Sequence, residues 1–182
     1  MSTAFEIRPS FVALGALIFC LAGWEVTAAV AGAVIVHESC HALAIWLFGG
    51  RVIRVTLSFC GAEMRCTGLK TGAELVSAAA GPIGSFALAL ILSRAGLYVA
   101  SGVSLVLGSF NLLPVYPLDG GRVLFASLRL FLRYETALRV RDIVSLITLA
   151  AFTLAAVYAA IVYRSYIFLP AGIGVWRMKN LR

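Results

Sequence analysis

Three side chains that could hold and use a metal ion interrupt an apolar segment of this sequence. In VIVHESCHALAIWLF, residues 34–48, the flanks have the composition of a membrane helix, yet His37, Glu38 and His41 lie inside. The histidines are four residues apart, so a helix would place both imidazoles on one face, where they can bind one ion. A charged side chain near the centre of a bilayer costs at least about 2.5–3.5 kcal/mol. A divalent cation would offset this cost, so the segment predicts a metal site.

The order of these residues is the H-E-x-x-H motif of zinc metalloproteases. Glu38 would be rotated about 100° from His37, so its carboxylate could reach a water at the ion without binding the ion. The ion would lower the pKa of that water to about 7 and polarise the scissile carbonyl, and Glu38 would move the water's proton to the leaving amine. The alternative is a coincidental pair of histidines, but the chain has only two, and both lie here.

A catalytic zinc usually has three protein ligands and one open position, so a carboxylate should be the third ligand. Asp119 stands out in NLLPVYPLDGGR, because it ends an apolar run after two prolines and before two glycines. An ordinary interfacial loop in which Asp119 caps the next helix fits these residues equally well. Glu74 is the second choice, although it also suits the first turn of a helix. The remaining candidates are Glu63, Glu135 and Asp142.

Composition places the chain in a membrane. Of its 182 residues, 62% are hydrophobic and 13% are charged, against roughly 45–50% apolar residues in soluble domains. A multi-pass membrane protein is the economical interpretation. The net charge is +7, and the basic residues fall between apolar runs, which suits cytoplasmic loops and anionic lipid headgroups and argues against nucleic-acid binding.

The pattern of apolar runs predicts an all-α polytopic membrane protein with about five to six transmembrane helices and a small β-hairpin between the second and third. A turn near residues 24–27 should separate the first two spans, and 121–132 should form a short interfacial helix. Whether 121–132 and 165–176 cross the membrane is left open. The whole chain, 1–182, is expected to be a single intramembrane domain. The expected spans are residues 11–29, 30–48, 73–93, 97–113 and 143–163.

The hairpin is predicted from period-two alternation over residues 51–67. Val55, Leu57 and Phe59 alternate there with polar residues, as in a strand, and a turn follows. Lipid cannot satisfy the backbone groups of a sheet edge, so the hairpin should lie at the membrane interface or against protein.

Three motifs together resemble the site-2 protease family of intramembrane zinc metalloproteases. They are H-E-x-x-H at residues 37–41, AAGPIGS in the third span and NLLPVYPLDGG after the fourth. The chain is most similar to the compact, prokaryotic, sporulation-protease-like branch, which lacks PDZ and CBS domains. One departure is Ser85, where the family often has asparagine; it leaves the role of AGPIGS open, with close helix packing as the favoured interpretation.

The resemblance implies one Zn²⁺ ion held by His37, His41 and Asp119, with Glu38 as the general base. It implies that Asn111 holds the substrate backbone or stabilises the developing oxyanion, with a helix-end cap as the alternative. It also implies that the hairpin covers the site and pairs with an unwound substrate as an added strand, through the segment that contains Val55, Leu57 and Phe59.

The implied function is hydrolysis of peptide bonds in or next to transmembrane segments of membrane-anchored substrates, as in regulated intramembrane proteolysis. The alternative is a non-catalytic membrane metal-binding scaffold or an inactive protease relative. The expected location is a prokaryotic cell membrane, with the active site toward the cytoplasm. The expected partners are a membrane-spanning substrate, a separate regulatory membrane protein and anionic lipids.

Overall fold

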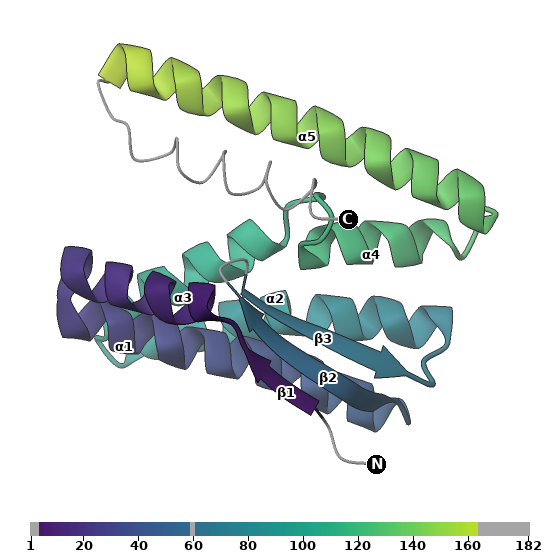
Figure 1. The fold of residues 1–182 in the computed structure, drawn as a ribbon, viewed down its shortest axis with the longest axis horizontal. Coiled ribbons are helices and arrows are strands. Elements are labelled where there is room, and N and C mark those ends of the chain that lie inside the picture. The colour runs from purple at the N-terminus through teal and green to yellow at the C-terminus, as the bar shows by residue number, and fades with distance from the viewer. Residues whose placement is uncertain (1–3, 59–60, 164–182) are drawn as a thin grey trace. The chain divides into compact units, whose positions relative to one another are not determined.

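The computed structural model describes residues 4–58 and 61–163, and it is mostly helical with one small sheet (Figure 1). The predicted fold class is therefore confirmed. The elements fall into two compact units, with the boundary between Leu112 and Leu113. In chain order they are β1 (Ala4–Ile7), α1 (Pro9–Leu47), β2 (Arg51–Ser58), β3 (Gly61–Thr67), α2 (Thr71–Arg94), α3 (Tyr98–Asn111), α4 (Asp119–Leu128) and α5 (Tyr134–Tyr163).

Within the described part of the chain, three helices are long and apolar enough to cross a membrane: α1, α2 and residues Tyr134–Ala159 of α5. The first two predicted spans fall in the 39-residue element α1, which consists of two helices joined by a break at Gly23. The fourth predicted span is the shorter apolar helix α3, whose 14 residues rise only about 21 Å. The predicted interfacial helix is the 10-residue α4, and residues 165–176 lie outside the described residues.

Helix α1 reverses direction at Gly23. Its φ of 78° and ψ of −178° are non-helical, and Figure 1 shows that α1 doubles back along its length. Glycine adopts this region readily because it has no Cβ. Thr27 donates a hydrogen bond to the Gly23 carbonyl at 2.8 Å, so the predicted turn is present and its break lies one residue before the predicted segment.

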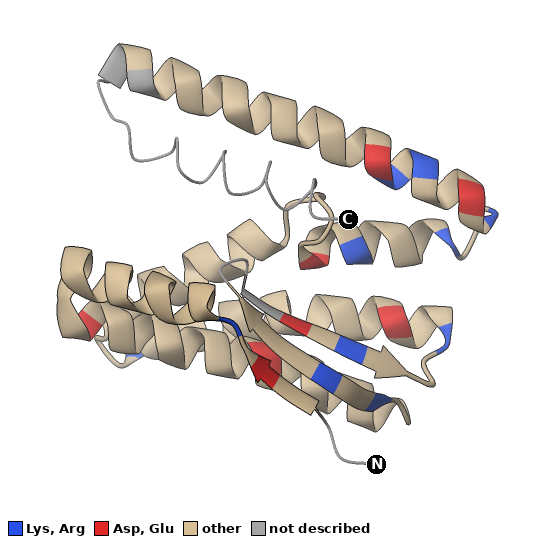
Figure 2. Cartoon of the chain, viewed as in Figure 1, with Lys and Arg blue, Asp and Glu red and all other residues tan. Residues whose placement is uncertain are grey.

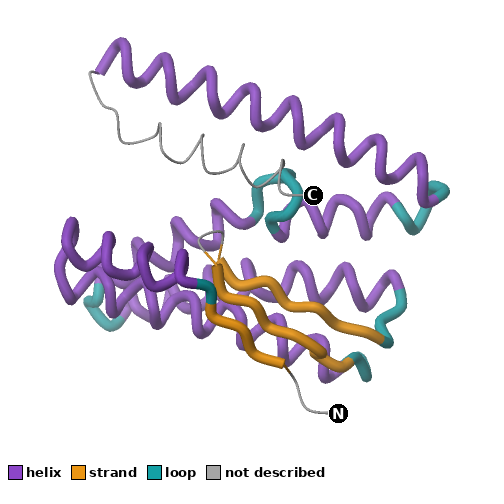
Figure 3. The backbone as a smooth tube through the Cα atoms, viewed as in Figure 1, coloured by secondary structure: helices purple, strands orange, loops and turns teal. Residues whose placement is uncertain are grey.

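The predicted hairpin is confirmed, and it belongs to a three-stranded sheet (Figure 3). β2 and β3 pair antiparallel, with Thr56 opposite Glu63. β1, which the sequence analysis did not predict, pairs parallel to β2, with Ile7 beside Leu57. β2 is therefore the middle strand, and the two edges of the sheet are β1 and β3.

Small residues let α2 approach its neighbours closely. A Cβ at Gly84 would overlap the Sγ of Cys40 on α1. A Cβ at Gly108 on α3 would lie 2.9 Å from the Cβ of Ser85 and 3.3 Å from the carbonyl oxygen of Pro82. Backbones come this near only where side chains are small, so these contacts support the packing interpretation of AAGPIGS.

In the second unit, α5 holds the turn that leads into α4. The Ser145 hydroxyl accepts a hydrogen bond from the Tyr116 N–H at 3.2 Å and donates one to the Pro114 carbonyl at 3.3 Å. Two backbone groups of an irregular segment are thus satisfied by one side chain of a helix. Such pairing is needed wherever backbone leaves regular structure away from water.

The buried Arg141, which lies one helical turn before Ser145 on α5, contacts the same irregular segment. The Arg141 guanidinium lies 4.4 Å from the ring centroid of Tyr116 and 5.1 Å from that of Phe125. It also donates to Asp142 Oδ1 at 2.8 Å, which balances its charge. In Figure 2 the charged residues of α5 lie in its first part, and the remainder carries none.

Replacing Gly23 with alanine should destabilise the chain through backbone conformation alone. A Cβ there meets nothing within 4 Å, but the conformation costs a residue with a side chain about 1–3 kcal/mol. Gly32→Ala is the matched control, because a Cβ there also meets nothing within 4 Å and its backbone is helical; it should be neutral or stabilise by up to about 1 kcal/mol. Thermal unfolding in detergent compares them, and equal unfolding temperatures would contradict this account.

Ser145→Ala should lower the free energy of unfolding by about 1–3 kcal/mol, because the Tyr116 N–H loses its acceptor and the Pro114 carbonyl loses its donor. Thr153→Ala is the control on the same helix, since its hydroxyl donates to the Leu149 carbonyl within α5. Denaturant unfolding followed by Trp fluorescence measures both. Equal losses would mean that Ser145 does not brace the turn.

Candidate metal centre

Helix α1 places the two predicted histidine ligands side by side in the interior. The Nε2 atoms of His37 and His41 lie 3.2 Å apart, and the imidazoles are nearly perpendicular, with an interplanar angle of 78°. Their exposed fractions are 3% and 4%. Two nitrogens bound to one tetrahedral zinc at about 2.0–2.1 Å would be about 3.3 Å apart. The pair therefore has the spacing of two ligands of one ion.

Helix α2 supplies a hydrogen-bond partner for the other ring nitrogen, Nδ1, of each histidine. His41 Nδ1 lies 2.6 Å from the carbonyl oxygen of Ser77, and His37 Nδ1 lies 2.8 Å from the hydroxyl oxygen of Ser85. Metal-binding histidines commonly use their second nitrogen in this way, which fixes the ring orientation. Both rings are thus oriented with Nε2 toward the same space.

Gly81 leaves that space open. It lies between Ser77 and Ser85 on α2, and a Cβ there would overlap His41 Nε2 and lie 2.7 Å from His37 Nε2. The volume that any side chain would fill is the volume next to both imidazole nitrogens. The residues present therefore fit a divalent ion, and imidazole ligands suit zinc.

Glu38, the predicted base, follows His37 on α1 and is half-buried, whereas both imidazoles are buried. A helix turns about 100° per residue, so the carboxylate leaves the helix at a different angle from the two rings. This orientation suits a proton acceptor near the ion better than an additional ligand.

Asn111 is the last residue of α3, and its Nδ2 donates to the Leu107 carbonyl at 3.1 Å. The Leu107 carbonyl lies four residues back within α3, so this is a local side-chain bond in the last turn and not a cap on an unpaired terminal carbonyl. An amide nitrogen has two hydrogens, and this bond uses one of them. The second hydrogen can still be donated to another acceptor.

Asp119 lies in the second unit as the first residue of α4. The N-cap of that helix is Leu118, which has no capping side chain, so the alternative that Asp119 caps the helix is wrong. The carboxylate is buried, and Oδ1 accepts a hydrogen bond from Arg122 Nη1 at 3.3 Å. A carboxylate in a first turn is also favoured by the helix dipole. Both interactions stabilise a negative charge at this position.

The other carboxylates named from the sequence have ordinary surroundings. Glu74 lies in the first turn of α2 and Glu135 in the first turn of α5, as the dipole favours. Glu63 is exposed and pairs with Arg65 at 3.3 Å, and Asp142 pairs with the guanidinium of Arg141.

The proposed strand-addition residues lie on the middle strand. Val55 and Leu57 of β2 are half-buried, and Phe59 lies outside the described residues. Because β1 and β3 occupy both sides of β2, an added strand would have to pair with β1 or β3. Side chains of β2 could contact such a strand, but the backbone of β2 is already used.

Sequence reasoning missed that α2 faces the histidines. Ser77, Gly81 and Ser85 recur every four residues, the same interval that separates His37 and His41. That shared helical period was the available signal, since residues four apart lie on one face. It was hidden because small residues also serve close packing.

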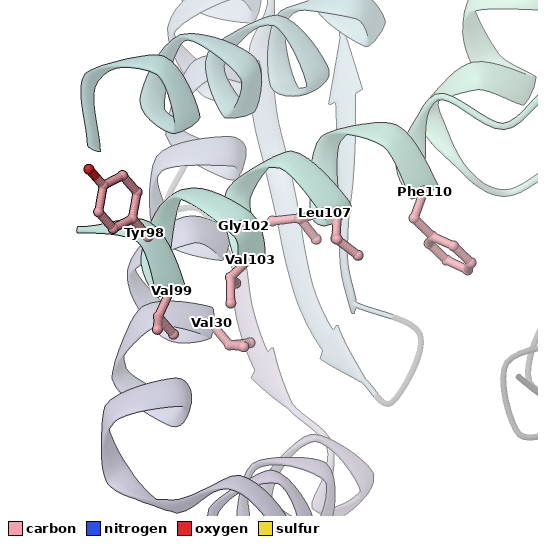
Figure 4. Close-up of a pocket in the computed structure, with 8 residues that line it drawn as sticks. Val30, Tyr98, Val99, Gly102, Val103, Leu107 and Phe110 are labelled. Carbon is pink, nitrogen blue, oxygen red and sulfur yellow. The ribbon is translucent and has the colours of Figure 1, made fainter. Parts of the chain in front are cut away.

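An apolar groove of about 530 Å³ lies between α1 and α3 (Figure 4). Val30 of α1 and Val103, Leu107 and Phe110 of α3 are among its lining residues, and none of the predicted site residues lines it. Its lining is apolar apart from the hydroxyl of Tyr98, and it lacks the imidazole and carboxylate groups of the proposed metal site.

Comparisons with known proteins find a family model, a curated relative and a solved structure that are similar to this chain. Residues 93–155 match the model of Peptidase family M50. That segment includes Asn111 and Asp119 and begins after the H-E-x-x-H motif. The zinc metalloprotease MJ0392 of Methanocaldococcus jannaschii is 31% identical over 107 residues, which are 52% of this chain and 32% of that protein. The chain thus spans about a third of the length of this curated relative.

The fold is similar to a solved structure, the site-2 protease from Methanocaldococcus jannaschii. The TM-score is 0.73 at 21% sequence identity, over 97% of this chain and 88% of that one. The resemblance to the site-2 protease family is therefore confirmed: the chain has the fold of that solved protease, and its residues 93–155 match the Peptidase family M50 model.

Proposed function

We propose that this chain is an intramembrane zinc metalloprotease that cleaves peptide bonds in or next to transmembrane segments of membrane-anchored proteins. The observation that carries the proposal is the pair of buried imidazoles, with Nε2 atoms 3.2 Å apart and both Nδ1 atoms held by α2. The pair belongs to an H-E-x-x-H motif on a helix apolar enough to cross a membrane. The M50 segment supports the same class of enzyme.

His37, His41 and Asp119 are the proposed ligands. Each is buried and offers one ligand atom, and together they make the usual set of three protein ligands of a catalytic zinc. When bound, zinc polarises a substrate carbonyl and lowers the pKa of a water to about 7. Arg122 holds one oxygen of Asp119 and so limits rotation of the carboxylate.

Glu38 and Asn111 have the proposed roles in proton transfer and substrate binding. The Glu38 carboxylate accepts the proton of the attacking water and donates it to the amine that leaves, so no covalent acyl-enzyme forms. Asn111 keeps one Nδ2 hydrogen on the Leu107 carbonyl and gives the second to the substrate carbonyl oxygen as its negative charge develops.

The sheet is the proposed platform for the unwound substrate. A peptide must be extended before it is cut, and an open strand edge supplies the backbone partners that an extended peptide needs. β1 and β3 are the open edges. Val55 and Leu57 would contact the substrate through their side chains from the middle strand.

The proposed setting is a prokaryotic cell membrane with the site toward the cytoplasm. The hairpin contains Arg51, Arg54 and Arg65 and is followed by Lys70, and basic loops favour that side. The substrate is a membrane-spanning protein. A separate membrane protein would regulate access, and anionic lipids would contact the basic loops.

Glu38→Gln should retain zinc and reduce cleavage at least 100-fold, because the amide cannot accept the water's proton. Glu25→Gln is the matched control, since Glu25 is exposed on the same helix. The assay co-expresses single-span membrane anchors and looks for cytoplasmic fragments. Normal cleavage by Glu38→Gln would remove Glu38 from the mechanism, and absence of cleavage by the parent chain across a broad panel would favour a metal-binding scaffold.

Asp119→Ala should weaken zinc binding by more than the 10–100-fold that loss of an outer partner costs, because a direct ligand is removed. Glu135→Ala is the control, since Glu135 is an exposed carboxylate. Zinc per chain is measured by mass spectrometry after dialysis against a graded chelator. Unchanged zinc in Asp119→Ala would move the third-ligand assignment to Glu74.

A further inference from the structure

Three residues of α2 contact the histidine pair at matching intervals. Ser77, Gly81 and Ser85 are spaced by four, and the two helices run antiparallel, so Ser77 meets His41 and Ser85 meets His37. Gly81 lies between them, where both Nε2 atoms converge. One face of α2 therefore contacts both imidazoles and the space between them.

The two Nδ1 partners differ in chemistry. The Ser77 partner is a backbone carbonyl oxygen, 2.6 Å from His41 Nδ1. A carbonyl can only accept, so His41 Nδ1 carries the proton and His41 Nε2 presents a lone pair. This tautomer of the neutral ring is the one that binds a metal through Nε2.

The partner of His37 is a hydroxyl, which can both accept and donate. Without an ion, two lone pairs 3.2 Å apart would repel, and a proton on His37 Nε2 that is donated to His41 would relieve this repulsion. The Nδ1 of His37 is then bare, and the Ser85 hydroxyl must donate to it. With an ion between the Nε2 atoms, the proton moves to Nδ1 and the hydroxyl accepts instead.

We propose that Ser85 is a positioning residue that holds His37 in one orientation through both tautomers, while Gly81 keeps the ion's space free of any side chain. A carbonyl oxygen in place of the Ser85 hydroxyl could accept a hydrogen bond but could not donate one. It could therefore hold His37 only when Nδ1 carries the proton, as in the metal-bound tautomer. The inference rests on the proposed function only in taking the histidine pair as a metal site, and it assigns to this segment a role beyond helix packing.

A second buried serine shows what a packing role alone looks like. Ser104 of α3 is also 0% exposed, and within the described part of the chain its Oγ has no hydrogen-bond partner. Ser85 and Ser104 are thus both buried serines, and they differ because the Ser85 hydroxyl contacts His37, a proposed metal-binding residue. Substituting alanine at each separates loss of a hydroxyl from loss of the His37 contact.

The test titrates purified chain in detergent with Zn²⁺ against a chelator and records the visible spectrum of the Co²⁺ form. Ser85→Ala should bind about 10–100-fold more weakly and give a shifted Co²⁺ spectrum, because His37 can rotate. Ser104→Ala should match the parent chain in both. Equal affinities and superimposable spectra for all three proteins would overturn the positioning role.

Gly81 is tested against Gly84, its neighbour at the same helix interface. A Cβ at Gly84 would crowd Cys40, whereas one at Gly81 would crowd the two imidazole nitrogens. Gly81→Ala should therefore lose Zn²⁺ binding, while Gly84→Ala should lose thermal stability and keep Zn²⁺. Equal loss of Zn²⁺ in both folded variants would mean that close packing explains the glycines, and would overturn the role of Gly81.

Because these measurements use metal ions without substrate, they separate the two proposals. A parent chain that binds Zn²⁺ and responds to Ser85→Ala, yet cleaves no anchor, would refute the protease function and leave the positioning role standing. A parent chain that binds neither Zn²⁺ nor Co²⁺ would refute both.

Discussion

Two imidazole nitrogens held 3.2 Å apart away from water are the constraint on which the rest of this structure depends. Facing lone pairs repel in a medium of low dielectric constant, so something positive must lie between them, either a proton or a cation. The neighbouring elements make room for such a proton or cation in three ways. α1 sets the spacing, α2 fixes the orientation of each ring, and the glycine between the two serines leaves the space unfilled.

The same constraint explains why α2 is built from small residues. A helix that must bring a carbonyl, a hydroxyl and an empty position to two rings cannot carry bulky side chains on that face. Ser77, Gly81 and Ser85 meet this requirement, and their spacing copies that of the histidines. The same three small residues thus allow close helix packing and orient the two imidazole rings. In the second unit, Ser145 and Arg141 do comparable work on the turn before Asp119.

Much of this arrangement could be predicted from the sequence because its determinants are local. The helical period alone places His37 over His41, and prolines with paired glycines mark the break before α4. The hairpin followed from alternation over residues 51–67. The turn within α1 was predicted to within one residue of its break at Gly23. The four-residue strand β1 was too short to show a period. The partnership of Ser85 with His37 depends on the register of two helices, which no local pattern encodes.

The parallel pairing of β1 with β2 has a consequence for membrane topology. β1 joins α1 through Arg8 alone, whose N–H donates to the Leu57 carbonyl at 2.9 Å, and β2 begins soon after α1 ends. Both ends of α1 are therefore tied to one sheet, and the break at Gly23 lies between them. Lipid cannot satisfy the open edges of that sheet, so it has to remain at water or against protein. The beginning and the end of α1 must then emerge on the same face of the bilayer, whichever face that is.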